Sequence, residues 1–109
     1  MPVVELTDAT FEEHIRKHPI VLVEFWAPWC KPCQAMAPVL EQLAAEAGGR
    51  ASIAACNADV NFVAAVRYQL QGIPSLVVFK EGREFSRKVG TQPLSVLLDM
   101  IESAHEADF

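Results

Sequence analysis

The sequence is 109 residues long, 51% hydrophobic and 21% charged, a composition typical of one globular domain and not of a disordered chain. Its net charge of −5, from 9 basic and 14 acidic residues without a basic patch, argues against a nucleic-acid-binding surface. The first residues lack a basic start followed by an apolar run, and no apolar stretch approaches the roughly 20 residues of a membrane span. We therefore expect a cytoplasmic protein that binds neither nucleic acid nor membrane.

The first half of the chain predicts two strands, each followed by a helix. Residues 3–6 predict a short strand, and residues 7–18 begin with a Thr or Asp cap and continue with apolar residues at helical spacing. Residues 20–27 are apolar at nearly every position and rich in branched and aromatic side chains, which favours a central strand covered on both faces. Apolar residues that recur at steps of three and four predict a second helix, which ends at Gly48. These residues are Cys33, Met36, Ala37, Leu40, Leu43, Ala44 and Ala47.

The second half of the chain predicts three strands and two helices. In order, these are strand 51–56, helix 61–69, strand 75–80, strand 83–89 and a helix that begins near Thr91. Glu81 and Gly82 predict a turn that makes the last two strands antiparallel neighbours. The resulting order, βαβαβαββα, favours an α/β fold in which helices cover both faces of a sheet.

Two cysteines, Cys30 and Cys33, lie in the segment EFWAPWCKPC, where an apolar strand ends and a helix begins. The first turn of a helix presents unpaired N–H groups and a partial positive charge, which favour a thiolate at Cys30. Pro32 is tolerated in that turn because its missing N–H would have no helical partner. The spacing i to i+3 brings the two sulfurs close enough to bond. We expect Cys30 to be the exposed attacking thiol and Cys33 to be the buried thiol that resolves a mixed disulfide.

Three segments carry a resemblance to a known family: WAPWCKPC, GIPSLVVFKEG and KVG. In this order, with matching spacings along nearly the whole chain, they resemble the thioredoxin family. The resemblance implies a thioredoxin-like three-layer sandwich, with a mixed central sheet of about five strands and four helices on both faces, in a single domain over residues 1–109. It also implies a protein-disulfide reductase, a thiol–disulfide oxidoreductase that acts on client proteins. Such a protein is re-reduced by a flavoprotein thioredoxin reductase and works as a monomer without a cofactor of its own.

The same resemblance assigns roles to individual residues. Cys30 is the nucleophile, Cys33 is the resolving cysteine, and Pro74 is a cis-proline that faces the disulfide. The backbone of Ile73 binds an extended client segment as an added strand. The residues implied in client binding, many of them on a flat apolar rim, are Trp29, Pro32, Gly72, Ile73 and Gly90.

Lys31 is the first departure from the family pattern, which usually has Gly-Pro between the cysteines where this chain has Lys-Pro. A positive charge at the start of the helix, beside Cys30, favours the thiolate and so stabilises the reduced form. We expect a more oxidising potential than that of Gly-Pro relatives. The alternative is a solvated surface lysine without effect.

Glu24 is the second departure. The family commonly has a buried aspartate here, under the second cysteine, and the resemblance implies that Glu24 takes the proton from the Cys33 thiol. Burial in so apolar a strand is expected to raise the pKa of this carboxyl, because burial disfavours its charged form. The family often places a buried lysine beside that aspartate, where this chain has Ala55, so Glu24 is expected to be protonated more often at neutral pH. The alternative is a strand-end carboxylate in water.

The sequence is also compatible with other functions. Lys31 and Glu24 leave room for an atypical thioredoxin with a dedicated reductase, a narrow client set or a more oxidising potential. A structural zinc module would need two ligands besides Cys30 and Cys33, and neither a second C-x-x-C nor a pair of histidines is present to supply them. A non-catalytic binding module could use the apolar rim, although the intact cysteine pair argues against it.

Four residues are set apart from the predicted site. Cys56 ends an apolar strand, so a small buried core residue is the favoured interpretation and a reactive extra thiol the alternative. The histidines lie in or at the ends of predicted helices, far in sequence from the cysteine pair, and are expected at the surface: His14, His18 and His105.

Overall fold

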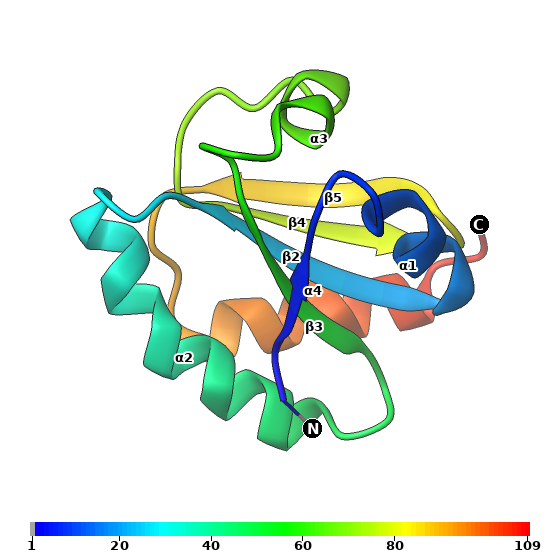
Figure 1. Ribbon diagram of the computed structural model, residues 1–109. Helices are drawn as coiled ribbons and strands as arrows, with labels where there is room; N and C mark the ends of the chain where they lie inside the picture. The colour runs from blue at the N-terminus through cyan, green and yellow to red at the C-terminus, as the bar shows by residue number, and fades with distance from the viewer. Residues whose placement is uncertain (1) are drawn as a thin grey trace.

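The computed structural model describes residues 2–109, which form a five-stranded sheet and four helices (Figure 1). The predicted elements are all present in the predicted order. They are β1 (Val4–Leu6), α1 (Phe11–Lys17), β2 (Ile20–Trp26), α2 (Lys31–Ala47), β3 (Ser52–Asn57), α3 (Phe62–Arg67), β4 (Ser75–Lys80), β5 (Arg83–Val89) and α4 (Leu94–Glu106).

β2 lies at the centre of the sheet, whose strand order is β1-β3-β2-β4-β5. β1, β3 and β2 run parallel, β4 is antiparallel to β2, and β5 is antiparallel to β4. The turn between β4 and β5 has positive φ at both Glu81 (52°) and Gly82 (79°), a backbone twist that suits a tight hairpin. The sheet is therefore mixed, and the prediction of a buried central strand is confirmed for β2.

Helices cover both faces of the sheet, α1 and α3 on one and α2 and α4 on the other (Figure 1). Successive side chains of a strand point to opposite faces. The odd-numbered residues of β2 accordingly belong to the core under α1 and α3, whereas Ile20 and Leu22 belong to the core under α2 and α4. Glu24 continues the second series, so the one acidic residue of β2 points toward α2.

Two helices begin later than predicted. α1 begins at Phe11, and the residues from Thr7 onward form a turn in which the Thr7 carbonyl accepts the N–H of Phe11 (2.9 Å). α4 begins at Leu94 rather than near Thr91, because Pro93 disfavours a helical backbone in the residue before it. Within residues 2–109, none of the helices has the length and apolar character needed to cross a membrane.

Candidate active site

The cysteine pair lies beyond the end of β2, where the chain enters α2. Cys30 and Cys33 are joined by a disulfide, with their Cα atoms 5.3 Å apart. Cys30 is the N-cap of α2, and its Sγ accepts the backbone N–H of Cys33 (3.2 Å). Pro32 lies in the first turn, where its missing N–H leaves no helical bond unmade. The prediction that this spacing brings the two sulfurs to bonding distance is confirmed.

The start of α2 provides an electropositive environment for the sulfur of Cys30. α2 is 17 residues long and has no acidic residue in its first turn, so no carboxylate there offsets the partial positive charge of the helix end. Lys31 is exposed at the first helical position and adds a full charge. After reduction of the disulfide, these groups favour the Cys30 thiolate, the nucleophilic form of a cysteine.

The burial of Cys30 differs from the prediction. Cys33 is 4% exposed, as expected of a residue on the apolar stripe of α2, but Cys30 is also only 4% exposed. Ala27 lies in one apolar cluster with the two cysteines, and Trp26 and Ile73 pack against it. The prediction of an exposed Cys30 is therefore wrong, because residues from the end of β2 and from the segment before β4 pack against the cysteine cluster.

Pro74 and its neighbours form the edge of the site opposite α2. The Ile73–Pro74 peptide bond is cis, and Ile73 packs against the cluster of Ala27, Cys30 and Cys33. The N–H of Gly90 donates to the Pro74 carbonyl (2.8 Å), and Gly90 has a φ of 95°, a conformation that favours glycine. A Cβ on Gly72 would lie 3.3 Å from a methyl of Val89, so glycine allows the two chain segments to approach closely. The sequence-predicted residues of this edge are thus brought together.

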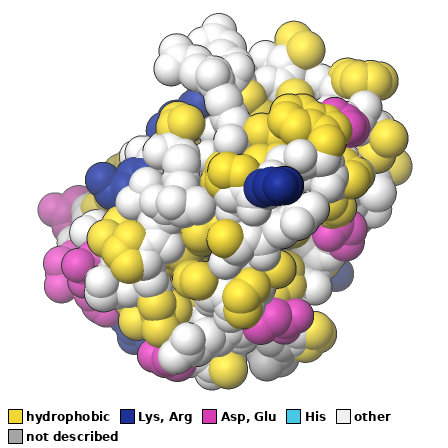
Figure 2. Space-filling model, turned by 90° about the vertical axis from the view of Figure 1, so that its left-hand side faces the viewer, with side chains coloured by type: hydrophobic (Ala, Val, Ile, Leu, Met, Phe, Trp, Pro, Cys, Tyr) yellow, Lys and Arg dark blue, Asp and Glu magenta, His cyan; other side chains and the backbone are white. Residues whose placement is uncertain are grey.

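Trp29 lies in the segment between β2 and α2, beside the cysteine pair. Figure 2 shows hydrophobic side chains exposed on this side of the molecule. The Trp29 side chain is 68% exposed, and its indole N–H is shared between the two carboxylate oxygens of Asp59 (3.1 and 2.9 Å). Asp59 is not among the site residues predicted from the sequence. One signal could have found it: Asp59 follows β3 as Trp29 follows β2, and the carboxyl ends of parallel strands meet at one edge of a sheet.

Glu24 is buried, with 3% of its surface exposed. The pKa of Glu24 is raised to about 7, mainly because burial disfavours the charged form and secondly because Glu5 carries a negative charge. Its Oε2 has no hydrogen-bond partner among residues 2–109. The interpretation of Glu24 as a strand-end carboxylate in water is therefore wrong, and the predicted rise in pKa is confirmed.

A cavity of about 350 Å³ connects Glu24 with Cys33, since both line it. The indole of Trp26 forms part of its wall. Ala55 lies opposite Glu24 in the β2–β3 register and lines the same cavity, where its methyl supplies no cation. The buried carboxyl and Cys33 thus share one space beneath the start of α2.

Cys56 lies on the opposite face of β3 and is fully buried in the core under α1 and α3. The pKa of its thiol is raised to about 12, mainly because burial disfavours the thiolate. A thiol that stays protonated at neutral pH is a weak nucleophile, so the prediction of a small core residue is confirmed.

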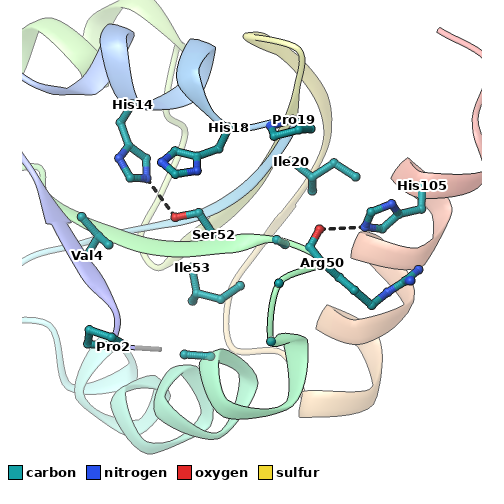
Figure 3. Close-up of a pocket in the computed structure, with 14 residues that line it drawn as sticks. Pro2, Val4, His14, His18, Pro19, Ile20, Arg50, Ser52, Ile53 and His105 are labelled. Atoms are coloured by element: carbon teal, nitrogen blue, oxygen red, sulfur yellow. Dashed lines mark hydrogen bonds between the residues drawn. The ribbon is translucent and has the colours of Figure 1, made fainter.

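A second cavity, of about 360 Å³, lies at the opposite ends of β2 and α2 from the cysteine pair (Figure 3). His14 and His18 line it with ring centroids 4.4 Å apart, and His105 reaches it from α4. Nε2 of His14 hydrogen-bonds the Ser52 hydroxyl (2.9 Å), and Nε2 of His105 hydrogen-bonds the Arg50 carbonyl (2.7 Å). His105 is exposed as predicted, whereas His14 and His18 are half-buried. His14 and His105 connect α1 and α4 to the β3 region, and all three histidines lie away from the cysteine site.

Comparison with known proteins places this geometry in a family. The family model described as thioredoxin matches residues 2–103. The chain belongs to the thioredoxin family. It is 41% identical over 102 residues to the thioredoxin of Staphylococcus saprophyticus, covering 94% of this chain and 97% of that protein. The thioredoxin of Staphylococcus aureus matches to the same extent. A solved structure of a mutant thioredoxin from Halobacterium salinarum is 34% identical, with a TM-score of 0.86 over 95% of this chain and 91% of that one.

Membership of the thioredoxin family establishes the class of activity. The chain is a thiol–disulfide oxidoreductase with a C-x-x-C redox pair, a protein-disulfide reductase, and its mixed sheet between two helical layers is the thioredoxin fold. The zinc-module alternative needs ligands beyond Cys30 and Cys33. Among the residues that the structure describes, no three His, Cys, Asp or Glu side chains lie close enough to hold a metal ion.

Proposed function

We propose that this chain reduces disulfide bonds of client proteins, with Cys30 as the attacking cysteine and Cys33 as the resolving one. The observation that carries the assignment is the place of Cys30 Sγ at the start of α2, where it accepts the Cys33 N–H. The position favours a thiolate at Cys30. Cys33 lies one turn into the helix, on its buried face.

The two electrons needed to reduce the client come from the two thiols. The Cys30 thiolate attacks one sulfur of the client disulfide, the client S–S bond breaks, and the second client sulfur leaves as a thiolate that takes up a proton. Cys33 then loses its proton and attacks the Cys30 sulfur of the mixed disulfide. The first client sulfur leaves as a thiolate, and the chain keeps the Cys30–Cys33 disulfide.

The client segment lies across the apolar edge around the disulfide, in contact with Trp29, Pro32, Gly72, Ile73 and Gly90. Trp29 supplies exposed apolar surface, and its bond to Asp59 fixes the plane of the ring. Within residues 2–109, no backbone hydrogen bond engages the N–H or the carbonyl of Ile73. These free groups support binding of an extended client strand through its backbone.

Glu24 acts as the base that takes the proton from Cys33. It lines the same cavity as Cys33, and its pKa of about 7 leaves it substantially ionised at neutral pH and able to accept a proton. No lysine stands at Ala55 to hold it in the charged form. The basicity of Glu24 is therefore matched to the pH at which the reaction runs.

The exchange Glu24→Gln is expected to slow the resolving step by about 100-fold and to leave the initial attack unchanged, because only the first step is independent of the Cys33 proton. Stopped-flow measurement of mixed-disulfide formation and of its release separates the two steps. Glu41→Gln is the control, since it removes an exposed carboxylate from α2. Equal slowing of both steps, or of neither, would contradict the base role.

Lys31→Gly is expected to lower the reduction potential by up to about 30 mV, because it removes the charge that stabilises the reduced form. Redox equilibration against glutathione measures the change. The control is Lys31→Arg, which keeps the charge and is expected to keep the potential. A Lys31→Gly potential that is unchanged or higher would show that Lys31 is a surface lysine without influence on the couple.

The electron donor we propose is a flavoprotein thioredoxin reductase, and the place of action is the cytoplasm, where such a reductase keeps dithiols reduced. We further propose that residues 1–109 act as one domain and as a monomer. The thioredoxin family implies both a reductase and client proteins. Titration of the potential tests the assignment: a strongly reducing value supports a disulfide reductase. A clearly oxidising one would favour an atypical member with its own reductase or clients.

A further inference from the structure

Two carboxyls flank Ala55 on the face of the sheet that α2 covers. The strand registers place Glu5 of β1 opposite Ala55 on one side and Glu24 of β2 opposite Ala55 on the other. Neighbouring strands lie about 4.8 Å apart, so the Cα atoms of Glu5 and Glu24 are about 10 Å apart. Side chains at one level of adjacent strands point to the same face, so both glutamates project over the Ala55 methyl.

The small side chain of Ala55 leaves room between the two carboxyls. Glu5, Glu24, Trp26 and Cys33 all line the cavity of about 350 Å³ described above. Glu5 is exposed, whereas Glu24 is 3% exposed. One space therefore connects the resolving cysteine, a buried carboxyl and a solvent-side carboxyl.

The two carboxyls differ in their hydrogen bonding. Oε2 of Glu5 accepts the indole N–H of Trp26 (3.2 Å), which holds the Glu5 side chain at the cavity wall. Oε2 of Glu24 is buried and, among residues 2–109, has no donor. A buried carboxylate oxygen without a donor is poorly stabilised, so the protonation of Glu24 responds strongly to nearby charge.

Few other charged groups face Glu24 from the elements around it. β3, β4 and α4 present apolar side chains on this face. The titratable and charged groups are Glu5 on β1, Cys33 and Glu41 on α2, and Lys88 on β5, one strand beyond Leu76. Glu41 and Lys88 are exposed, so water screens their charges.

We propose that Glu5 is a positioning residue of the redox site, which acts through Glu24 on the proton that Cys33 releases. The inference rests on the base role of Glu24 proposed above. Ionised Glu5 disfavours a second negative charge across Ala55, and it adds to burial in raising the pKa of Glu24 to about 7. Glu5 ionises first, while Glu24 is still neutral, so the repulsion between the two carboxylates appears in the titration of Glu24.

Glu5 thereby sets the pH range in which resolution is fast. The Cys33 S–H gives its proton to the Glu24 carboxylate, and the Cys33 thiolate attacks the Cys30 sulfur. The client sulfur leaves as a thiolate. The proton on Glu24 then passes to water, because the cavity is open to solvent on the side of the exposed Glu5.

The test is the substitution Glu5→Gln, which removes the charge but keeps a side-chain carbonyl that can accept the Trp26 N–H. Carboxyl-carbon NMR of the oxidised protein follows the titration of Glu24. We expect its midpoint to fall by about one pH unit, the size expected for a carboxylate on a residue whose Cα atom lies about 10 Å away, in partly desolvated surroundings. The pH midpoint of the resolving step is expected to fall by the same amount.

Two control variants make the result specific to Glu5. Glu41→Gln changes the net charge equally and lies at the same cavity, and it is expected to move the Glu24 midpoint by less than about 0.3 of a pH unit. Glu24→Gln is expected to leave the titration of Glu5 nearly unmoved, because Glu24 is still neutral over the pH range in which Glu5 ionises.

An unmoved Glu24 midpoint in Glu5→Gln overturns the proposal. So does an equal shift in Glu41→Gln, or a shift in the titration without a shift in the resolving step. Failure of the base role of Glu24 is recognised separately. In that case Glu24→Gln resolves the mixed disulfide as fast as the parent chain does. The titration of Glu24 in Glu5→Gln does not depend on that role.

Discussion

Replacement of Cys33 by serine is expected to trap the chain on its client as a mixed disulfide. The backbone N–H that Cys30 Sγ accepts belongs to residue 33 and is kept in Cys33→Ser, so the thiolate at Cys30 keeps its stabilisation and still attacks. Serine cannot displace the client sulfur, because its hydroxyl is not ionised at neutral pH. Turnover is expected to fall on the order of 1,000-fold or more, as for loss of a group that acts covalently.

Mass spectrometry of the product detects the trap as a one-to-one covalent complex that a small thiol releases. The matched control is Cys30→Ser, which is expected to form no complex and to lose turnover to the same extent. Cys56 is present in both variants and does not substitute for Cys30, because it is fully buried and the pKa of its thiol is raised to about 12. Trapping by Cys30→Ser equal to that by Cys33→Ser would show that either cysteine can attack the client, and the assignment of separate roles would be wrong.

The order of the elements could be predicted from the sequence because local patterns determine it. β2 is apolar at nearly every position, as a strand paired on both edges and covered on both faces requires. The apolar stripe of α2 starts at Cys33 and ends before Gly48, and both ends agree with the structure. The cysteine site could be predicted for the same reason, since a strand end and a helix start adjoin it directly.

The features that were missed depend on contacts between segments far apart in the chain. Cys30 is buried because Ile73, from the segment before β4, packs over the disulfide. Asp59 meets Trp29 only because β2 and β3 are parallel neighbours. The register that places Glu5 and Glu24 on either side of Ala55 likewise follows from the strand order. Periodicity within one segment carries no information on these pairings.

Glu24 is expected to make the protein less stable as the pH rises from about 4.5 to about 7. Its pKa rises from 4.5 to about 7 on folding, so the folded chain binds a proton more tightly than the unfolded chain does. The contribution of Glu24 to the free energy of unfolding is therefore fully present below pH 4.5. It is lost as the pH rises from 4.5 to about 7, and it is absent above that range. The difference corresponds to about 3 kcal/mol in the free energy of unfolding, since one pH unit is worth about 1.4 kcal/mol.

The substitution Glu24→Gln isolates this contribution, because a glutamine side chain stays neutral at every pH and has nearly the same shape. Urea unfolding of the oxidised protein, at intervals between pH 4 and pH 8, is expected to show Glu24→Gln gaining about 3 kcal/mol relative to the parent chain as the pH rises. Glu41→Gln, which changes an exposed glutamate of α2, is expected to show little pH-dependent gain. A constant difference between Glu24→Gln and the parent across this range would mean that Glu24 is already ionised well below neutral pH, and its role as a base poised near pH 7 would then be wrong.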